Sequence, residues 1–229
     1  GLPDDKTLDR IYEQNPDGGG IGYVFKASDG IRYIAHRKGL MVKADFIKAV
    51  KESFAKLTED DDYIVAHTRI ATSGGKSADK THPFTLENGG LLFHNGICSA
   101  VTKLITPLES DTEYLAKTFT SAEDLSKIDS ASRYFIINPD GSPKMLGTWI
   151  KDDDGRMWSN SGYKDYPRAY GHGYGYGYGY GYGDYGYGSS YYSSTYPTAR
   201  ENALFEILQQ RAPKMAKKTM DLLLEHNID

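Results

Sequence analysis

The sequence from residue 63 to residue 74 reads YIVAHTRIATSG. Its first half, residues 63–68, is a short apolar run with β-branched residues, which is typical of a strand. Arg69 comes directly after this run, and a loop rich in Gly, Ser and Lys follows at residues 73–81. An Arg at a strand end beside such a loop is well placed to bind a carboxylate through two parallel hydrogen bonds. A lone Arg in this position has a surface ion pair as its alternative role.

Two further segments carry polar groups that suit the same kind of ligand. Residues 93–97 (FHNGI) end a predicted strand with Asn95 and Gly96. The side-chain amide of Asn95 and the backbone N–H of Gly96 together could stabilise an oxyanion. Residues 110–113 (SDTE) place Asp111 at the start of a predicted helix, where its carboxylate can hold an ammonium group. A carboxylate holder, an ammonium holder and oxyanion donors describe a site for an amino acid whose side-chain amide is hydrolysed.

Each of these features has a structural alternative when it is taken alone. An Asn-Gly pair is most often a turn, and an Asp that opens a helix is usually an N-cap. His67 and His94 lie in or beside predicted strands, and we interpret them as packing or hydrogen-bonding residues. His82 precedes Pro83, and we interpret it as a loop anchor that shapes the pocket.

Taken as an ordered set, these motifs carry a resemblance to a known family. The set comprises NPDG (residues 15–18), HTRIAT (67–72), HPF (82–84), HNG (94–96), SDTE (110–113), GTW (147–149) and WSNS (158–161). Residues 1–163 of the chain resemble class II glutamine amidotransferases, and look most like the compact stand-alone versions often encoded by bacteriophages. The resemblance implies an N-terminal-nucleophile (Ntn) hydrolase fold, which is an α+β, four-layer αββα sandwich of mainly antiparallel sheets.

The resemblance also implies roles for individual residues. Arg69, helped by the region of Thr72, would bind the α-carboxylate of glutamine, and Asp111 would bind its α-ammonium group. Asn95 and the Gly96 N–H would form the oxyanion hole, and these two are the candidate catalytic groups. His82 joins Arg69, Thr72 and Asp111 in the candidate substrate-binding set. No metal or other cofactor is expected.

The nucleophile is where the chain departs from the family. In class II amidotransferases the attacking thiol belongs to an N-terminal Cys, whose own α-amine is the general base. Residue 1 here is Gly, and Cys98 follows the oxyanion-hole motif and is interpreted as a buried small hydrophobe. We therefore expect either that a short strand carrying the Cys precedes Gly1, or that the protein is a degenerate relative. Hydrolysis of glutamine is expected only if a Cys lies upstream of Gly1.

The rest of the first 163 residues reads as a mixture of short strands and helices without regular βαβ alternation, which favours an α+β fold. Helices are predicted over residues 4–14, 43–57, 111–119 and 122–128, and strands over residues 21–26, 31–36, 63–68, 90–94, 133–138, 144–150 and 157–160.

Composition changes beyond residue 163. Residues 164–197 form a Tyr/Gly-rich low-complexity linker, in which Tyr alternates with Gly from Tyr174 to Tyr182. Residues 198–229 are predicted to form a C-terminal helical segment. Dense Tyr favours stacking and hydrogen bonding at low entropic cost, which suits self-association. We expect residues 170–192 to be disordered unless they contact another chain.

Charge and composition limit the classes of function. The net charge of −4 argues against a nucleic-acid partner, and no apolar run is long enough to span a membrane. A single Cys excludes an internal disulfide. The sequence indicates a cytoplasmic protein, in a bacterial host or in a virion if it is phage-encoded. Two functions stay open: a domain that binds glutamine or a similar small amide, and a phage structural or assembly protein whose tail contacts a copy of itself or a virion partner.

Overall fold

A computed structural model describes residues 1–118 and 122–165. The described residues form helices and antiparallel strands, so the predicted α+β class is confirmed. In chain order the elements are α1 (Asp5–Gln14), β1 (Gly19–Lys26), β2 (Arg32–Leu40), α2 (Lys43–Phe54), β3 (Tyr63–Thr68), η1 (Ala78–Lys80), β4 (Phe84–Thr85), β5 (Leu91–Asn95), η2 (Ser99–Val101), α3 (Asp111–Thr118), α4 (Ala122–Ile128), β6 (Arg133–Ile137), β7 (Pro143–Leu146), β8 (Ile150–Lys151), β9 (Met157–Trp158) and η3 (Ser161–Tyr163).

The strands form three antiparallel sheets in the described part of the chain. The first sheet has the order β2-β1-β3, the second has the order β4-β5-β6-β7, and β8 pairs with β9. In the first sheet Gly20 pairs with His67, and in the second sheet Asn95 pairs with Arg133. The two strand ends that carry the predicted site motifs therefore belong to different sheets.

Helices α1 and α2 cover one face of the first sheet. Residues 21 and 23 of β1 point to this face because side chains alternate along a strand. Ile21 and Tyr23 are buried there with Leu8 from α1 and Phe46 from α2. Helix α1 begins after Asp4, whose carboxylate accepts a hydrogen bond from the Thr7 N–H at 2.8 Å and so satisfies one of the unpaired donors of the first turn.

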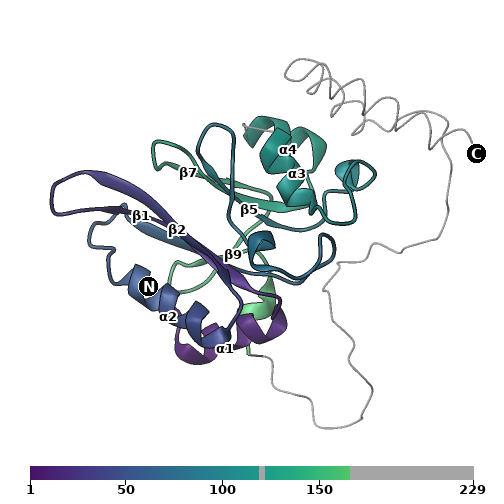
Figure 1. Ribbon diagram of the computed structural model, residues 1–229. Coiled ribbons are helices and arrows are strands. Elements are labelled where there is room, and N and C mark those ends of the chain that lie inside the picture. The colour runs from purple at the N-terminus through teal and green to yellow at the C-terminus, as the bar shows by residue number, and fades with distance from the viewer. Residues whose placement is uncertain (119–121, 166–229) are drawn as a thin grey trace, which may run out of the picture.

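Helices α3 and α4 cover one face of the second sheet. Leu115 of α3 and Leu125 of α4 are buried against Leu92 of β5 and Tyr134 and Ile136 of β6. In Figure 1 α1 and α2 lie on one side of the strands and α3 and α4 lie on the other.

A third apolar cluster joins the two sheets. Val24 of β1 packs with Leu91 and Phe93 of β5 and with Ile137 of β6, and all four side chains are buried. Side chains alternate along a strand, so the residues next to these four in their strands point the opposite way, toward the helices. Strands β1, β5 and β6 thus bury side chains on both faces, one against helices and one against the other sheet.

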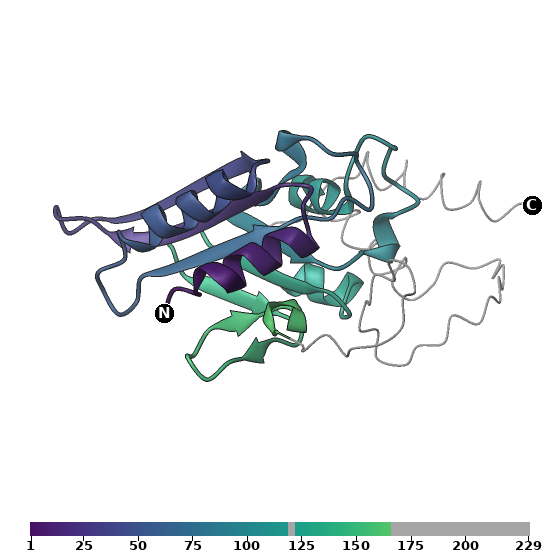
Figure 2. The same cartoon turned by 90° about the horizontal axis from the view of Figure 1, so that it is seen from below.

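The β8–β9 hairpin and the turn η3 lie next to α1, as the view from below shows (Figure 2). The Arg10 guanidinium donates a hydrogen bond to the Tyr163 carbonyl at 2.6 Å. This contact ties the end of the described chain back to its first helix.

The structure differs from the sequence prediction at several element boundaries. The strand predicted over residues 21–26 begins two residues earlier, because Gly19 and Gly20 lie in β1 and pair with Thr68 and His67 of β3. The strand predicted over residues 144–150 is two strands, β7 and β8, separated at Gly147, where φ is +82°.

The predicted Tyr/Gly-rich linker from residue 166 onward and the predicted C-terminal helical segment lie outside the described residues. Within the described part of the chain, no helix has the length and apolar character needed to cross a membrane.

Candidate functional site

Arg69 leaves β3 and holds the loop that follows it. Its guanidinium donates hydrogen bonds to the carbonyl of Ser73 at 2.6 Å and to the carbonyl of Gly75 at 2.7 Å. The side chain is buried, and this burial lowers the pKa of Arg69 from its usual value, while the nearby carboxylates of Asp17 and Asp111 act in the opposite direction. A guanidinium stays charged under all ordinary conditions, so Arg69 supplies a buried positive charge at this strand end.

The loop held by Arg69 packs on the start of α3. A Cβ atom added at Gly74 would lie 2.9 Å from the Ser110 nitrogen, and Gly74 has a φ of +70°. A side chain would not fit at this position, so the two backbones approach closely. The contact brings the carboxylate-binding candidate, Arg69, and the ammonium-binding candidate, Asp111, to the same region of the molecule.

Asp111 is buried, with 7% of its surface exposed. One carboxylate oxygen accepts a hydrogen bond from the backbone N–H of Cys98 at 2.9 Å, and the other accepts one from the backbone N–H of Thr112 at 2.8 Å. The bond from Cys98 connects the start of α3 to the turn that follows β5, and the bond from Thr112 lies within α3. The carboxylate is therefore held by the segment that carries the predicted oxyanion-hole motif.

Asn95 and Gly96 lie at the end of β5, as predicted. The Asn95 side-chain amide donates a hydrogen bond to the Ser159 hydroxyl at 2.6 Å. Gly96 has a φ of +149°, and a Cβ atom there would overlap the Ser132 side chain. Only glycine fits at this position without displacing Ser132. Packing is therefore one reason for a glycine after Asn95, in addition to the predicted catalytic role.

The remaining two candidates differ in burial. Thr72 is exposed, whereas His82 is buried with 5% of its surface exposed. The peptide bond between His82 and Pro83 is cis. The His82 Nε2 atom lies 3.4 Å from the Thr112 hydroxyl, so this loop also contacts the start of α3.

The structure thus brings some of the candidates together and leaves others apart. Arg69, His82 and Asp111 meet around the first turn of α3. Asn95 and Gly96 are connected to Asp111 through the turn that contains Cys98, and the Asn95 side chain bonds to Ser159 on another segment. Thr72 has an exposed position in the loop beyond Arg69.

Three histidines and one threonine contact one another beside these residues, and of the four only Thr112 received no role from the sequence. We call His67, His82, His94 and Thr112 the polar cluster. The Thr112 hydroxyl lies 2.9 Å from His94 Nδ1, and His67 Nε2 lies 3.0 Å from the His94 carbonyl. The rings of His67 and His82 are 3.9 Å apart. The interpretation of His67 and His94 as hydrogen-bonding residues is confirmed. Thr112 was missed because its hydroxyl position depends on packing, and the only signal was its place in the SDTE motif.

Cys98 is buried and lies away from solvent. Burial, with the negative charges of Asp129 and Asp111 nearby, raises the pKa of the Cys98 thiol to about 12. A thiol with such a pKa is almost entirely protonated near neutral pH and is a poor nucleophile.

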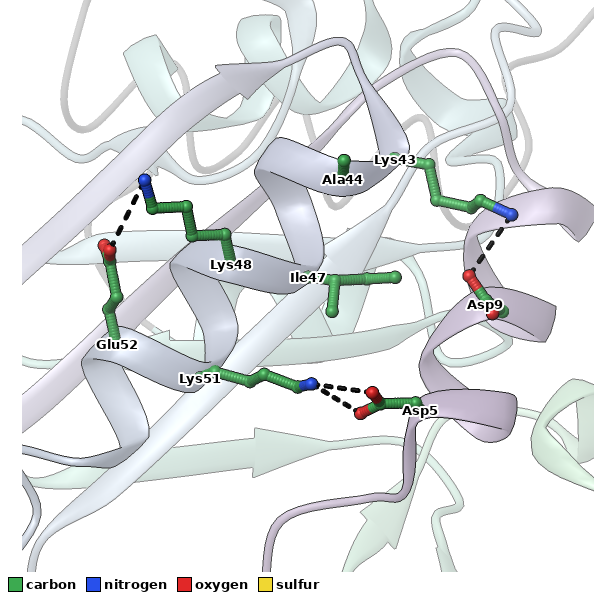
Figure 3. Close-up of a pocket in the computed structure, with 8 residues that line it drawn as sticks. All are labelled: Asp5, Asp9, Lys43, Ala44, Ile47, Lys48, Lys51 and Glu52. Atoms are coloured by element: carbon green, nitrogen blue, oxygen red, sulfur yellow. Dashed lines mark hydrogen bonds and ion pairs between the residues drawn. The ribbon is translucent and has the colours of Figure 1, made fainter.

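A separate open groove of about 480 Å³ lies between α1 and α2. Figure 3 shows that its rim is formed by ion pairs between the two helices, such as Lys51 with Asp5 and Lys43 with Asp9, above Ile47. Each charge drawn there has a partner of opposite sign, and none of the predicted site residues lines the groove. Across residues 1–118 and 122–165, no group of three or more His, Cys, Asp or Glu side chains is arranged to hold a metal ion.

The fold and these contacts define an α+β domain with buried charges of both signs near one helix start. Comparison of the chain with models of known protein families finds no match, and comparison with curated proteins finds none either.

Proposed function

We propose that residues 1–163 form a glutamine-binding domain of the class II amidotransferase type, with Arg69 for the α-carboxylate and Asp111 for the α-ammonium group. The observation that carries the proposal is the packing of the Arg69-held loop on the first turn of α3. Glutamine carries its carboxylate and ammonium groups on one carbon atom, so its receptor needs opposite charges at neighbouring positions. Arg69 and Asp111 are close enough for the Asp111 carboxylate to favour the charged form of Arg69.

Both side chains keep capacity for a ligand. A guanidinium has five N–H donors, and Arg69 donates two described hydrogen bonds, both to carbonyls of its own loop. Each carboxylate oxygen of Asp111 has two lone pairs. Burial reduces the screening of both charges by water, so each would attract a ligand charge more strongly than it would at the surface.

The packing of the layers supports the same proposal. Helices, the first sheet, the second sheet and helices follow one another through three apolar clusters. This order is compatible with an αββα sandwich of the Ntn-hydrolase type, which is the finer form of the fold that we propose. Amide hydrolysis in this fold would use a Cys upstream of Gly1, with Asn95 and Gly96 as the oxyanion donors.

The proposal is tested by titrating L-glutamine into the protein and measuring heat by calorimetry. We expect saturable binding that is weakened in Asp111→Asn. Removing one partner of a buried charge pair costs about 2–5 kcal/mol, which is more than about ten-fold in affinity. Asp154→Asn is the matched control, because Asp154 lies in the exposed turn between β8 and β9 and should leave the affinity unchanged.

Thermal unfolding of each variant shows whether it remains folded, since Asp111 also accepts two backbone hydrogen bonds. A folded wild-type chain that releases no heat with millimolar L-glutamine would overturn the proposal. That result would favour the alternative, a phage structural or assembly protein that reuses the fold. The Tyr/Gly-rich composition of residues 164–197 supports this alternative, because dense Tyr suits contacts between chains.

A further inference from the structure

The Thr112 hydroxyl lies among three polar groups from three segments. It is 2.9 Å from His94 Nδ1 on β5, 3.4 Å from His82 Nε2 before Pro83, and 3.4 Å from Asp111 Oδ1 on its own helix. Thr112 is itself 3% exposed. The hydroxyl is therefore the point at which β5, the loop before β4 and α3 meet.

The number of protons and lone pairs on each group determines which group donates in each hydrogen bond. A hydroxyl has one proton to donate and two lone pairs, and an ionised carboxylate can only accept. The Thr112 hydroxyl therefore donates to Asp111, and both imidazoles donate to Thr112, His94 from Nδ1 and His82 from Nε2. Burial lowers the pKa of both imidazoles, so each is neutral near pH 7 and carries one proton. The bare nitrogens are His94 Nε2 and His82 Nδ1, and these two atoms have no hydrogen-bond partner among the described residues.

The His94 ring is also held by contacts other than the one with Thr112. Its ring stacks on Tyr134 at 4.5 Å with an angle of 8° between the planes, and the Tyr134 hydroxyl donates to Asp129 at 2.7 Å. His94 Nε2 lies 4.0 Å from the Asp129 carboxylate. The ring stacking and the bond between Tyr134 and Asp129 thus hold the His94 ring in the orientation in which its Nδ1 atom faces the Thr112 hydroxyl.

We propose that Thr112 is a positioning residue for ligand binding: its hydroxyl, oriented by His94 and His82, holds the Asp111 carboxylate toward the α-ammonium group of the ligand. This inference rests on the proposed function, because it assigns a partner to the ammonium-binding carboxylate. Two histidines of the polar cluster also lie beside site residues in the sequence. His67 is two residues from Arg69, and His94 is next to Asn95.

The experiment compares Thr112→Val, which removes the hydroxyl at nearly constant shape, with Thr112→Ser, which retains it. Each protein is titrated with L-glutamine and with glutaramate, which lacks the α-amino group. We expect Thr112→Val to lose about ten-fold in affinity for L-glutamine, the effect of one hydrogen bond to a charged group. Its affinity for glutaramate should change less than about two-fold, and Thr112→Ser should restore glutamine binding. An equal loss for both ligands would overturn the proposal, because a general structural defect has no ligand preference.

A second readout does not depend on glutamine. The nitrogen-15 NMR spectrum of the histidines reports which ring nitrogen carries the proton. We expect His94 to be protonated at Nδ1 in the wild type and in Thr112→Ser, and to lose this preference in Thr112→Val. A wild-type His94 protonated at Nε2 would overturn the inference even if glutamine binds. If the wild type binds neither ligand, the proposed function fails, and the spectrum still shows separately whether His94 donates to the Thr112 hydroxyl.

Discussion

The single thiol of the chain is enclosed by the second sheet and α3, and its surroundings oppose ionisation. Cys98 is fully buried, and the carboxylates of Asp111 and Asp129 add negative charge near the sulfur. A thiolate nucleophile needs the opposite environment, which is partly exposed and electropositive. At the residue scale, Cys98 therefore belongs to the core, in agreement with its interpretation from sequence.

This environment predicts that Cys98 does not react in the native protein. At pH 8 a thiol reagent such as iodoacetamide should leave it unmodified over hours, and should label it fully after unfolding in urea. The polypeptide beginning at Gly1 should not hydrolyse glutamine by means of this thiol. Mass spectrometry and ammonia release provide the measurements. Rapid native labelling, or glutaminase activity that Cys98→Ala abolishes, would show that the thiol is accessible.

At the scale of a single element, β1 depends on its glycines. Gly22 leaves room for the Phe93 ring, since a Cβ atom there would lie 3.0 Å from its tip, and a Cβ atom at Gly20 would overlap the His82 carbonyl. Both residues face the second sheet, whereas Ile21 and Tyr23 face the helices. Along residues 20–23 of β1, glycines thus face the second sheet and large side chains face the helices.

We expect Gly20→Ala to lower the free energy of unfolding by at least about 3 kcal/mol, because the added methyl group meets backbone that cannot move without shifting a strand. Urea denaturation measures the change. Gly155→Asn is the matched control: nothing lies within 4 Å of a Cβ atom at Gly155, and Asn tolerates its φ of +81°. The control should change stability by less than about 1 kcal/mol. Equal effects at the two positions would contradict the close approach of β1 to the His82 loop.

At the scale of the whole molecule, the polar cluster joins the first sheet, the second sheet and α3. His67 pairs the end of β3 with the His94 carbonyl of β5. Burial lowers the pKa of His67 to about 4, with a smaller contribution from the positive charge of Arg69, and burial also lowers the pKa of His82 and of His94. For His82, nearby Lys38 acts in the same direction, whereas Asp111 and Asp129 oppose the shift at His94.

The sign of the pH effect follows from these directions. An unfolded histidine has a pKa of about 6.5. Between this value and the lowered native value the unfolded chain binds more protons than the folded one, so stability falls as the pH falls. We expect His67 to contribute about 2 kcal/mol of lost stability between pH 7 and pH 5. This window lies above the range in which most carboxylates titrate.

Urea denaturation at several pH values tests this prediction. His67→Gln keeps a donor for the His94 carbonyl but cannot be protonated, so it should reduce the acid sensitivity. His36→Gln is the control, because His36 is exposed on β2; partial burial and the charge of Lys38 lower its pKa, and its variant should reduce the acid sensitivity less than His67→Gln does. A wild-type stability that does not change from pH 7 to pH 5, or a reduction of equal size in the control, would argue against the buried neutral state.

Sequence patterns were sufficient for the elements and for the order of the motifs. Residues 63–68 carry their strand signal locally, and so do the amphipathic helix after residue 43 and the turn residues between β6 and β7, because period and turn chemistry act over a few residues. The patterns also placed Arg69, Asn95 and Asp111 at the ends of elements. The roles carried over from the family resemblance remain predictions.

The packing of distant segments was needed for the rest. No local pattern states that Gly19 and Gly20 continue a strand, because their pairing partners lie almost fifty residues later in β3. No pattern states that Gly74 meets Ser110, or that one hydroxyl at Thr112 serves two histidines and a carboxylate. These are contacts between groups that are far apart in the chain. Their geometry comes from the way the helices and the two sheets bury their apolar faces, and that burial fixes the positions of the polar groups enclosed with them.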